Sequence, residues 1–419
     1  MRPRRILLGA FGDPGHAFPM IALGVALRHR GHEVTLQTWE RWRPQVEAEG
    51  LAFAPAPEYH VFPNGPEPLD LYEAVVYATR DTEPLLRELA PEVVVSDILT
   101  LAPALCAELY GVPLATLIPH VFPESADGFP IYSFGARLPR TATGRALWRH
   151  AHWPVRKGLE SGRAALNRTR AQLGLPPQSR FHGGTSEQLA LVGSFPQLEY
   201  PRRWPAHVHV VGPLMWEPPG EQVVPPTPPR SSRDGSDAER PVVLIAPSTS
   251  QDPEHRLLLA ALKGLANAPV RVIATWNKRL PPRPLPVPEN AAVVDWVSYS
   301  KTMPLCDLVV CHAGHGTLAR ALSNGCPVIA CPVAGDMNEN AARIAWSGAG
   351  LRLPQRFIAP RPLRLAVERA AGDVAMRTRA KEIAEWAARH DPADTAAMLV
   401  EGLAADAPPS SVPIAAAAH

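Results

Sequence analysis

A glycine-rich turn in the C-terminal half carries residue types that can bind a phosphate group. Residues 312–317 read His-Ala-Gly-His-Gly-Thr and stand between an apolar run over 308–311 and an apolar-periodic segment. A strand, a glycine turn and a helix start in this order present unpaired helical N–H groups, which bind anions. The glycines let a ligand approach the backbone, and the first histidine adds a hydrogen-bond donor. We therefore predict an anion site made by His312, Gly314, Gly316 and Thr317. The alternative for His312 is a buried, hydrogen-bonded histidine.

Two polar residues in the N-terminal half stand where predicted strands end. His16 follows a strand over 5–9 and a Gly/Pro-rich turn, and Asp97 ends a strand over 91–96. An imidazole titrates near neutral pH, so it can take a proton from a hydroxyl group. A carboxylate that is hydrogen-bonded to the imidazole fixes its tautomer and stabilises the imidazolium. The plainer alternatives are a loop histidine bonded to the backbone and, for Asp97, a helix N-cap.

These polar residues belong to two halves of the chain that are built alike. Each half begins with an apolar strand, a helix and a second apolar strand, as in a buried parallel sheet. Later, each half has a strand that ends in a polar residue, a helix and a Gly-x-Pro turn. The expected openings are strand 5–9, helix 19–29 and strand 33–38, then strand 241–246, helix 255–267 and strand 270–276. We predict an α/β fold of two facing Rossmann-like, doubly wound parallel-sheet domains, with ligands in a cleft at the carboxyl ends of the strands.

The domain boundaries follow from composition. Residues 216–240 contain three Pro-Pro pairs and a Ser/Gly-rich run, which is typical of a solvated linker. We therefore expect an N-terminal acceptor-binding domain over 1–215, a linker over 216–240 and a C-terminal domain over 241–403. The last helix is expected to pack back on the N-terminal domain. The Ala/Pro/Ser-rich residues 404–419 are expected to be disordered.

Composition limits the function classes. The chain has 419 residues, enough for two domains, and a net charge of +2. That charge gives no reason to expect nucleic acid as a partner. Five cysteines without a C-x-x-C pair argue against disulfides and a zinc site. No apolar segment approaches the length that spans a membrane, so we expect no membrane insertion and a cytoplasmic protein.

The C-terminal half resembles the donor-sugar signature of the GT-B nucleotide-sugar glycosyltransferases, a family that decorates small molecules, natural products and antibiotics among them. The resemblance rests on residues 312–317, on the Gly-x-Pro at 325–327 and on Gly335-Asp336 with Asn340. It implies that His16 is the base that deprotonates the acceptor and that Asp97 orients it. It also implies donor contacts from residues that bind the diphosphate, the nucleotide base and the sugar. These are Ser248, Thr249, Trp296, Val297, His312, Gly314, Gly316, Thr317, Asp336, Met337 and Asn340.

Two positions depart from the family pattern. Arg320 stands where many relatives have a glutamate that binds the ribose, and Met337 stands where they have a glutamine that binds the sugar. A methionine cannot pair a sugar hydroxyl, and an unpaired buried hydroxyl is costly. We therefore expect a deoxysugar, carried on thymidine diphosphate; the donor substrate is a dTDP- or UDP-sugar. No further cofactor is expected, and the lack of any Asp-x-Asp pair predicts that no metal is needed.

No motif defines the acceptor site. Residues 57–77 and 119–134 are the candidate segments, with an aromatic lining as the hypothesis and ordinary loop packing as an equal alternative. The candidate lining residues are Phe122, Phe129, Tyr132 and Phe134.

Taken together, the sequence predicts an inverting glycosyltransferase that moves a hexose or deoxyhexose to a small, largely apolar acceptor. One alternative is a nucleotide-sugar 2-epimerase, which shares the architecture but has no need of His16 with Asp97. The other is a non-catalytic activator of a second glycosyltransferase. The expected partners are the nucleotide sugar and the small-molecule acceptor, and a homodimer is left open.

Overall fold

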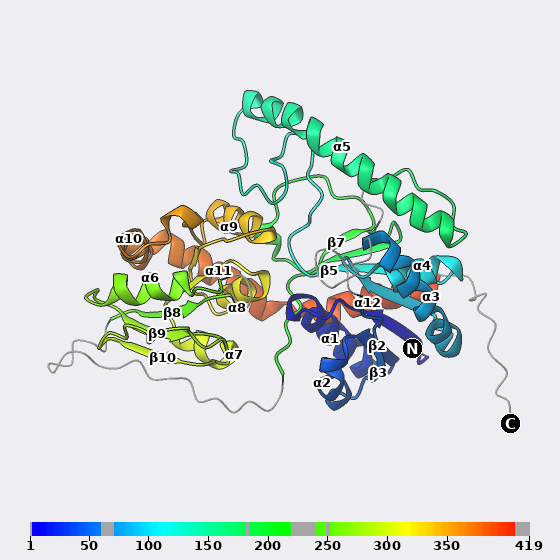
Figure 1. Cartoon of the computed structure of the whole chain (residues 1–419), viewed down its shortest axis with the longest axis horizontal. Coiled ribbons are helices and arrows are strands. Elements are labelled where there is room, and N and C mark those ends of the chain that lie inside the picture. Colours follow the sequence, from blue (N-terminus) through cyan, green and yellow to red (C-terminus); the bar gives the residue numbers. More distant parts are fainter. Residues whose placement is uncertain (1, 60–70, 182–183, 219–239, 249–251, 407–419) are drawn as a thin grey trace.

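Two parallel sheets, each covered by helices, form two domains that lie next to each other in the computed structural model (Figure 1). The structure describes residues 2–59, 71–181, 184–218, 240–248 and 252–406. Most of the predicted linker, residues 219–239, and most of the predicted tail, residues 407–419, therefore lie outside the described residues. Within the described residues, no helix combines the length and the apolar character needed to cross a membrane.

The N domain is built on a seven-stranded sheet in the order β3-β2-β1-β4-β5-β6-β7, with every pair of neighbours parallel. Its strands are β1 (Arg5–Gly9), β2 (Glu33–Thr38), β3 (Ala52–Pro55), β4 (Val93–Asp97), β5 (Leu114–Ile118), β6 (Leu189–Val192) and β7 (Val208–Val210). Its helices are α1 (Pro14–His29), α2 (Arg43–Ala48), α3 (Leu71–Leu89), α4 (Leu101–Leu109) and α5 (Ala142–Gln172), with 3-10 turns η1 (Glu40–Trp42) and η2 (Pro196–Leu198).

The C domain is built on a six-stranded parallel sheet in the order β10-β9-β8-β11-β12-β13. Its strands are β8 (Val242–Ala246), β9 (Arg271–Thr275), β10 (Ala291–Val294), β11 (Leu308–Cys311), β12 (Val328–Ala330) and β13 (Gly350–Arg352). Its helices are α6 (Arg256–Leu265), α7 (Tyr299–Thr302), α8 (His315–Ser323), α9 (Asp336–Ser347), α10 (Pro360–Gly372) and α11 (Val374–Arg389), with 3-10 turns η4 (Met303–Leu305) and η5 (Gln355–Phe357).

Both sheets reverse their strand order at the same relative place. In the N domain the reversal lies between β1 and β4, and in the C domain it lies between β8 and β11. The loops that follow two such strands diverge, and ligands of open α/β sheets bind in the crevice that this leaves. His16 follows β1 and Asp97 is the last residue of β4, while Ser248 and His312 follow β8 and β11. The topology therefore brings the predicted residues of each half to one edge of its sheet, and it confirms the predicted fold class.

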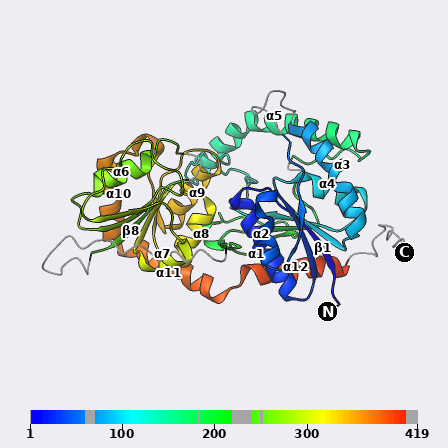
Figure 2. The same ribbon diagram turned by 60° about the horizontal axis from the view of Figure 1, so that its bottom comes forward.

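The chain crosses between the domains a second time at its C-terminal end. Helix α12 (Pro392–Asp406) leaves the C domain after α11 and lies against α1 of the N domain (Figure 2). Its buried Ala397 and Val400 join the N-domain core. Arg30 donates two hydrogen bonds to the Glu401 carboxylate, at 2.9 and 2.8 Å. Apolar burial and a charge-assisted pair together hold this helix on the N domain.

Helices α1 and α5 are two of the places where the structure departs from the sequence expectation. Helix α1 begins at Pro14 and not near residue 19, because Pro14 occupies the first helical position, where its missing N–H costs nothing. Pro19 is tolerated inside the helix. The 31-residue helix α5 was not predicted at all; it is polar on most of its surface and lies apart from both sheets (Figure 1). A helix with so few buried residues has little apolar periodicity to detect.

Candidate active site

His16 and Asp97 form a hydrogen-bonded pair at the strand reversal of the N domain. The Nδ1 atom of His16 lies 2.8 Å from Oδ1 of Asp97. Asp97 is buried, and its other oxygen accepts from the backbone N–H of Phe11 at 3.3 Å. Since Nδ1–H is donated to the carboxylate, neutral His16 keeps its lone pair on Nε2. The structure therefore brings these two residues together as the sequence predicted, and neither plainer alternative fits: Thr100, not Asp97, is the N-cap of α4.

The turn before His16 is held by aromatic packing on a glycine. A Cβ atom at Gly12 would lie only 2.0 Å from the Trp39 ring, so only glycine fits there. The indole N–H of Trp42 donates to the Gly12 carbonyl at 2.7 Å. His16 is the third residue of α1, and its backbone N–H donates to Asp13 at 2.9 Å. The imidazole thus projects from the first helical turn, where the backbone is already hydrogen-bonded.

Burial and Asp97 act in opposite directions on His16. Burial lowers the pKa of the imidazole, but the hydrogen bond and the charge of Asp97 outweigh it, and the pKa is raised above 6.5. The carboxylates of Asp13 and Asp336 raise it further. An imidazole whose conjugate acid is stabilised in this way is a stronger base.

A second histidine, which the sequence reasoning missed, lies beside His16. The rings of His16 and His120 are 6.3 Å apart, and the ring of Tyr132 lies 6.4 Å beyond that of His120. His120 donates from Nδ1 to the Val121 carbonyl at 2.8 Å. Burial lowers its pKa, so it is neutral near pH 7. The buried hydroxyl of Tyr132 has no hydrogen-bond partner among the described residues. Only its place after the carboxyl end of β5, on the same edge of the sheet as Asp97, could have indicated His120.

Asp336 of the C domain faces this group of N-domain side chains. Its carboxylate raises the pKa of His16, and it acts in the same direction on His120 and Tyr132. Asp336 begins helix α9 directly after Gly335, whose φ is +56°. A Cβ atom on Gly335 would meet nothing within 4 Å. The predicted sugar-binding aspartate and the predicted base therefore lie on facing sides of the two domains, with open space beside Gly335.

The glycine turn before α8 is open to a ligand. Gly314 is the N-cap of α8, and a Cβ atom there would meet nothing within 4 Å. Thr317 is half-buried, and its hydroxyl hydrogen-bonds with the Tyr299 hydroxyl. Ala313 has a φ of +64°, which is unusual for a residue with a Cβ atom. Asn340 holds that turn by donating from Nδ2 to the Ala313 carbonyl at 3.0 Å.

His312 differs from the expectation that it offers a free donor to a diphosphate. It is buried, its Nδ1 donates to the Cys331 carbonyl at 2.9 Å, and its Nε2 lies 3.1 Å from Oδ2 of Asp252. Asp252 also accepts from two backbone N–H groups at the start of α6. Both residues line a cavity of about 140 Å³. His312 thus matches the alternative of a buried, hydrogen-bonded histidine, and its partner Asp252, sixty residues away, could not be identified from the sequence.

The remaining predicted donor residues are spread over the C domain. Trp296 is half-buried, with the Lys278 ammonium 5.1 Å from its ring, whereas the Val297 side chain is buried in the core and can offer only its backbone. Ser248 is half-buried after β8, and Thr249 lies outside the described residues. Asn340 is also buried; besides the Ala313 carbonyl it contacts Asp336 at 3.2 Å. Its Nδ2 atom therefore orients Asp336, while its Oδ1 atom has no hydrogen-bond partner among the described residues.

Met337 and Arg320, the two residues that depart from the family pattern, both contact other parts of the protein. Met337 is half-buried and packs against the C-domain core. Arg320 donates to the carbonyl oxygens of Trp216 and Gly316, and burial lowers its pKa. Arg320 therefore joins α8 to the segment that leads out of the N domain.

The predicted aromatic lining is only partly accessible. Phe122 is 1% exposed and packs on Trp204, so it belongs to the core and the prediction for it is wrong. Phe129 is half-buried against Tyr200, and Phe134 is 63% exposed. Tyr132 alone of the four lies beside His120. Aromatic residues in a loop do not reveal from sequence which of them fill the interior.

No group of three or more His, Cys, Asp or Glu side chains in the described part of the chain is arranged to hold a metal ion. All five cysteines are free thiols, four of them buried.

Comparisons with known proteins agree with this geometry. Residues 6–106 match the glycosyltransferase family 28 N-terminal domain, and residues 259–402 match the C-terminal domain of the erythromycin biosynthesis protein CIII-like family. The O-mycaminosyltylonolide 6-deoxyallosyltransferase of Streptomyces fradiae is 32% identical to the chain, over 95% of this chain and 97% of that protein.

This chain belongs to the GT-B glycosyltransferases. The 4'-demethylrebeccamycin synthase of Lentzea aerocolonigenes is 28% identical, over 95% of this chain and 99% of that protein. The crystal structure of CalG4, the calicheamicin glycosyltransferase, superposes with a TM-score of 0.75 at 23% identity, covering 98% and 100% of the two chains. The enzyme is therefore a glycosyltransferase of the natural-product type, as the sequence resemblance implied.

Proposed function

We propose that the enzyme transfers a sugar from a nucleoside diphosphate to a hydroxyl group of a small, largely apolar acceptor, with inversion at the anomeric carbon. The His16–Asp97 pair is the observation that carries this proposal, because it supplies a neutral imidazole with an oriented lone pair. His16 Nε2 takes the acceptor proton as the acceptor oxygen bonds to the anomeric carbon. The bond to the diphosphate breaks on the opposite face of the sugar, and the nucleoside diphosphate leaves with the electron pair.

The donor is proposed to lie against the C domain. The first N–H groups of α8 point out of the turn at Gly314 and Gly316 and would stabilise the leaving diphosphate. Trp296 would stack on the nucleotide base, and Asp336 would bind a sugar hydroxyl. The position of Asp336 supports this arrangement, because its charge raises the pKa of His16. The two residues must lie near each other if the sugar and the acceptor meet between Asp336 and His16.

Met337 and Arg320 support a deoxysugar on thymidine diphosphate. Met337 cannot pair a sugar hydroxyl buried against it, at a cost of roughly 1–3 kcal/mol. Arg320 stands where many relatives have a glutamate, and it donates to the Trp216 carbonyl. This position therefore offers no carboxylate to a ribose 2′-hydroxyl. The similar Streptomyces fradiae enzyme is named for a 6-deoxy sugar, which agrees with this choice.

The test is a donor panel with natural-product aglycones, in which products are identified by mass spectrometry and the anomeric configuration by NMR. TDP-6-deoxyglucose, TDP-glucose and UDP-glucose form a matched series that separates the sugar from the nucleotide. We expect the first to have the highest kcat/KM and the product to be inverted. The variant Met337→Gln should regain use of the fully hydroxylated sugars. A tenfold preference for UDP-glucose would refute the deoxysugar assignment.

The same assay separates the alternative functions. A 2-epimerase would produce an isomeric donor sugar without any acceptor, and an activator would show no turnover without a second enzyme. The enzyme should instead release nucleoside diphosphate in proportion to glycosylated acceptor.

A further inference from the structure

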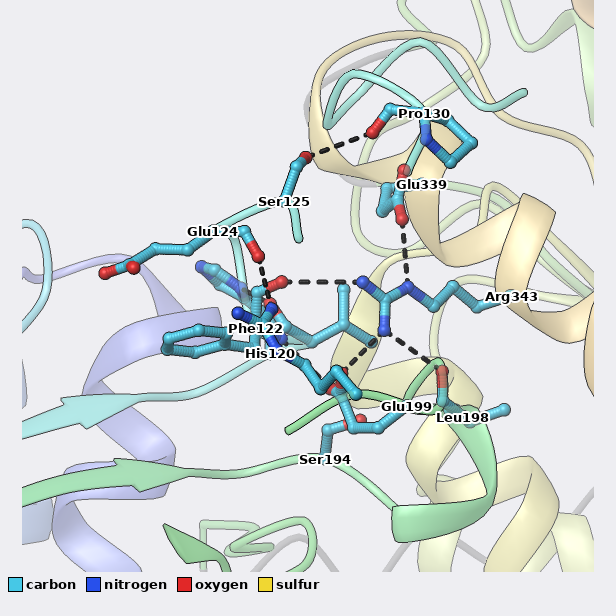
Figure 3. A network of polar contacts seen from close by, with 12 residues as sticks. His120, Phe122, Glu124, Ser125, Pro130, Ser194, Leu198, Glu199, Glu339 and Arg343 are labelled. Atoms are coloured by element: carbon cyan, nitrogen blue, oxygen red, sulfur yellow. Dashed lines mark hydrogen bonds and ion pairs between the residues drawn. The ribbon is translucent and has the colours of Figure 1, made fainter. Parts of the chain in front are cut away.

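A buried guanidinium joins the two domains (Figure 3). Arg343 extends from α9 of the C domain, and its Nη1 donates to Glu199 of the N domain at 2.6 Å. Its Nε donates to Glu339, one turn earlier on α9, at 2.9 Å. It also donates to the backbone carbonyl oxygens of Leu198 and Phe122. All three charged side chains are buried, so each contact is made away from solvent.

These contacts hold one end of residues 119–135, the segment that follows β5 and is called the acceptor loop below. Glu199 accepts from the backbone N–H of Phe122 at 3.0 Å, while Arg343 donates to the Phe122 carbonyl at 3.5 Å. Both backbone polar groups of one loop residue are therefore bound by the same ion pair. Val121, next to it, is packed within the core of the C domain.

The C domain also holds the other end of the acceptor loop. The backbone N–H of Ser133 faces the Glu339 carboxylate and acts to lower its pKa, and Arg352 donates to the Gly135 carbonyl. Ser133 has a φ of 67°, a conformation that a residue with a Cβ atom rarely adopts without support. A Cβ atom at Gly135 would lie 2.7 Å from the Asn338 carbonyl oxygen. The loop backbone thus touches α9 so closely that a side chain at Gly135 does not fit.

The acceptor loop carries His120 and Tyr132, while α9 carries Asp336 at its first turn. Both loop residues lie within two ring contacts of His16. Helix α9 therefore begins at the predicted sugar-binding residue Asp336. One turn and two turns further along, Glu339 and Arg343 of the same helix hold the loop beside the predicted base. A ligand that restrains α9 restrains the loop as well.

We propose that Arg343 and Glu339 are positioning residues that fix the acceptor loop to the donor domain, so that occupation of the donor site stabilises the loop that receives the acceptor. This proposal rests on the proposed function, since it requires a nucleoside diphosphate site at α8 and α9. By reciprocity, a well-held acceptor loop favours donor binding by the same factor. The loop then presents His120 and Tyr132 in one arrangement when a sugar is in place.

Two glycines of the acceptor loop offer a matched pair of variants. Gly128 and Gly135 both have positive φ, at +74° and +63°, so an alanine costs similar backbone strain at either place. The added Cβ at Gly128 meets Arg145 of α5, inside the N domain, whereas at Gly135 it meets Asn338 and Arg352 of the C domain. Gly135→Ala therefore separates the loop from α9, and Gly128→Ala is the control for strain within the loop.

The experiment measures hydrogen–deuterium exchange of peptides from the acceptor loop, with and without saturating TDP or UDP, in the full-length protein. In wild type and Gly128→Ala, bound nucleotide should slow exchange in the loop by about tenfold, a typical size for coupling between two sites. In Gly135→Ala this protection should vanish. In transfer assays, Gly135→Ala should raise the acceptor KM by about tenfold, while nucleotide release to water at saturating donor stays unchanged.

The proposal is overturned if bound nucleotide leaves the wild-type loop unprotected, or if Gly135→Ala and Gly128→Ala behave alike. Cooperative unfolding shows whether Gly135→Ala is folded. If it is not, Arg352→Met takes its place, because it removes the hydrogen bond to the Gly135 carbonyl without changing the loop backbone. The same outcomes then apply to Arg352→Met. Absence of binding by either nucleotide contradicts the proposed function itself, and the coupling with it. Binding without protection contradicts only the coupling.

Discussion

The His16 imidazole donates from Nδ1 to Asp97 at 2.8 Å, across the strand reversal of the N-domain sheet. The C domain has the same pairing with the residue types exchanged. There Asp252 lies in the loop after β8, and His312 follows β11, 3.1 Å away. The two pairs differ in whether a ring nitrogen of the histidine remains available to a ligand. His16 retains Nε2, whereas both ring nitrogens of His312 are bonded within its own domain. Of these two pairs, only the N-domain pair is arranged to act as a base.

The pH dependence of turnover should report the His16–Asp97 pair. His16 must be neutral to accept a proton, and its pKa is raised above 6.5, so kcat/KM should fall as the pH drops through that raised value. Asp97→Asn removes the charge and weakens the hydrogen bond that raise this pKa. The acid limb of the pH–rate profile should therefore move to lower pH, while kcat falls. A limb that stays in place in Asp97→Asn would mean that another group titrates.

The Asp252–His312 pair should stabilise the folded protein at neutral pH. Burial opposes ionisation of Asp252, but hydrogen bonds from His312 and from two backbone N–H groups outweigh it and lower its pKa to about 2. Because the pKa is lower in the folded than in the unfolded protein, the ionised carboxylate stabilises the fold at pH values above its unfolded-state pKa. This contribution disappears as the pH falls towards 2. From that shift, Asp252→Asn should cost on the order of 2 kcal/mol at neutral pH. Chemical denaturation near pH 7 and pH 3 tests this, because the difference from wild type should shrink at the lower pH.

The leaving diphosphate should not need a divalent ion. The open N-terminus of α8 supplies backbone N–H groups and a favourable dipole to an anion, and the sequence contains no Asp-x-Asp pair. Transfer activity should therefore survive EDTA. The check is the initial rate in EDTA compared with that in added Mg²⁺ or Mn²⁺. A strict requirement for either ion would contradict this arrangement.

The sequence predicted the parts of the site that depend on strand order. His16 and Asp97 each end or follow an apolar strand, and two such strands at a sheet reversal must present their carboxyl ends together. The turn at Gly314 was recognisable for the same local reason. These predictions needed only the strand pattern, the glycines and the family resemblance.

The parts that were missed depend on contacts between distant segments. The engagement of His312 with Asp252 requires the loop after β8 to fold over β11. The burial of Phe122 and the position of His120 depend on how the acceptor loop turns beneath α9. Arg343 drew no attention as one arginine in an amphipathic helix, although its buried side chain contacts both domains. Side-chain type alone does not determine such long-range packing.

The central claim is that His16 is the base of a glycosyl transfer, and the variant His16→Ala tests it most directly. Steady-state transfer and nucleotide binding should be measured on the same preparation. The account predicts that kcat falls by roughly 10²–10⁴, because the proton acceptor is lost, while the Kd of the nucleoside diphosphate stays close to that of wild type. His16 lies in the N domain and the proposed nucleotide contacts lie in the C domain, which is why the two quantities should separate. Turnover near the wild-type rate, or loss of nucleotide binding, would contradict the account.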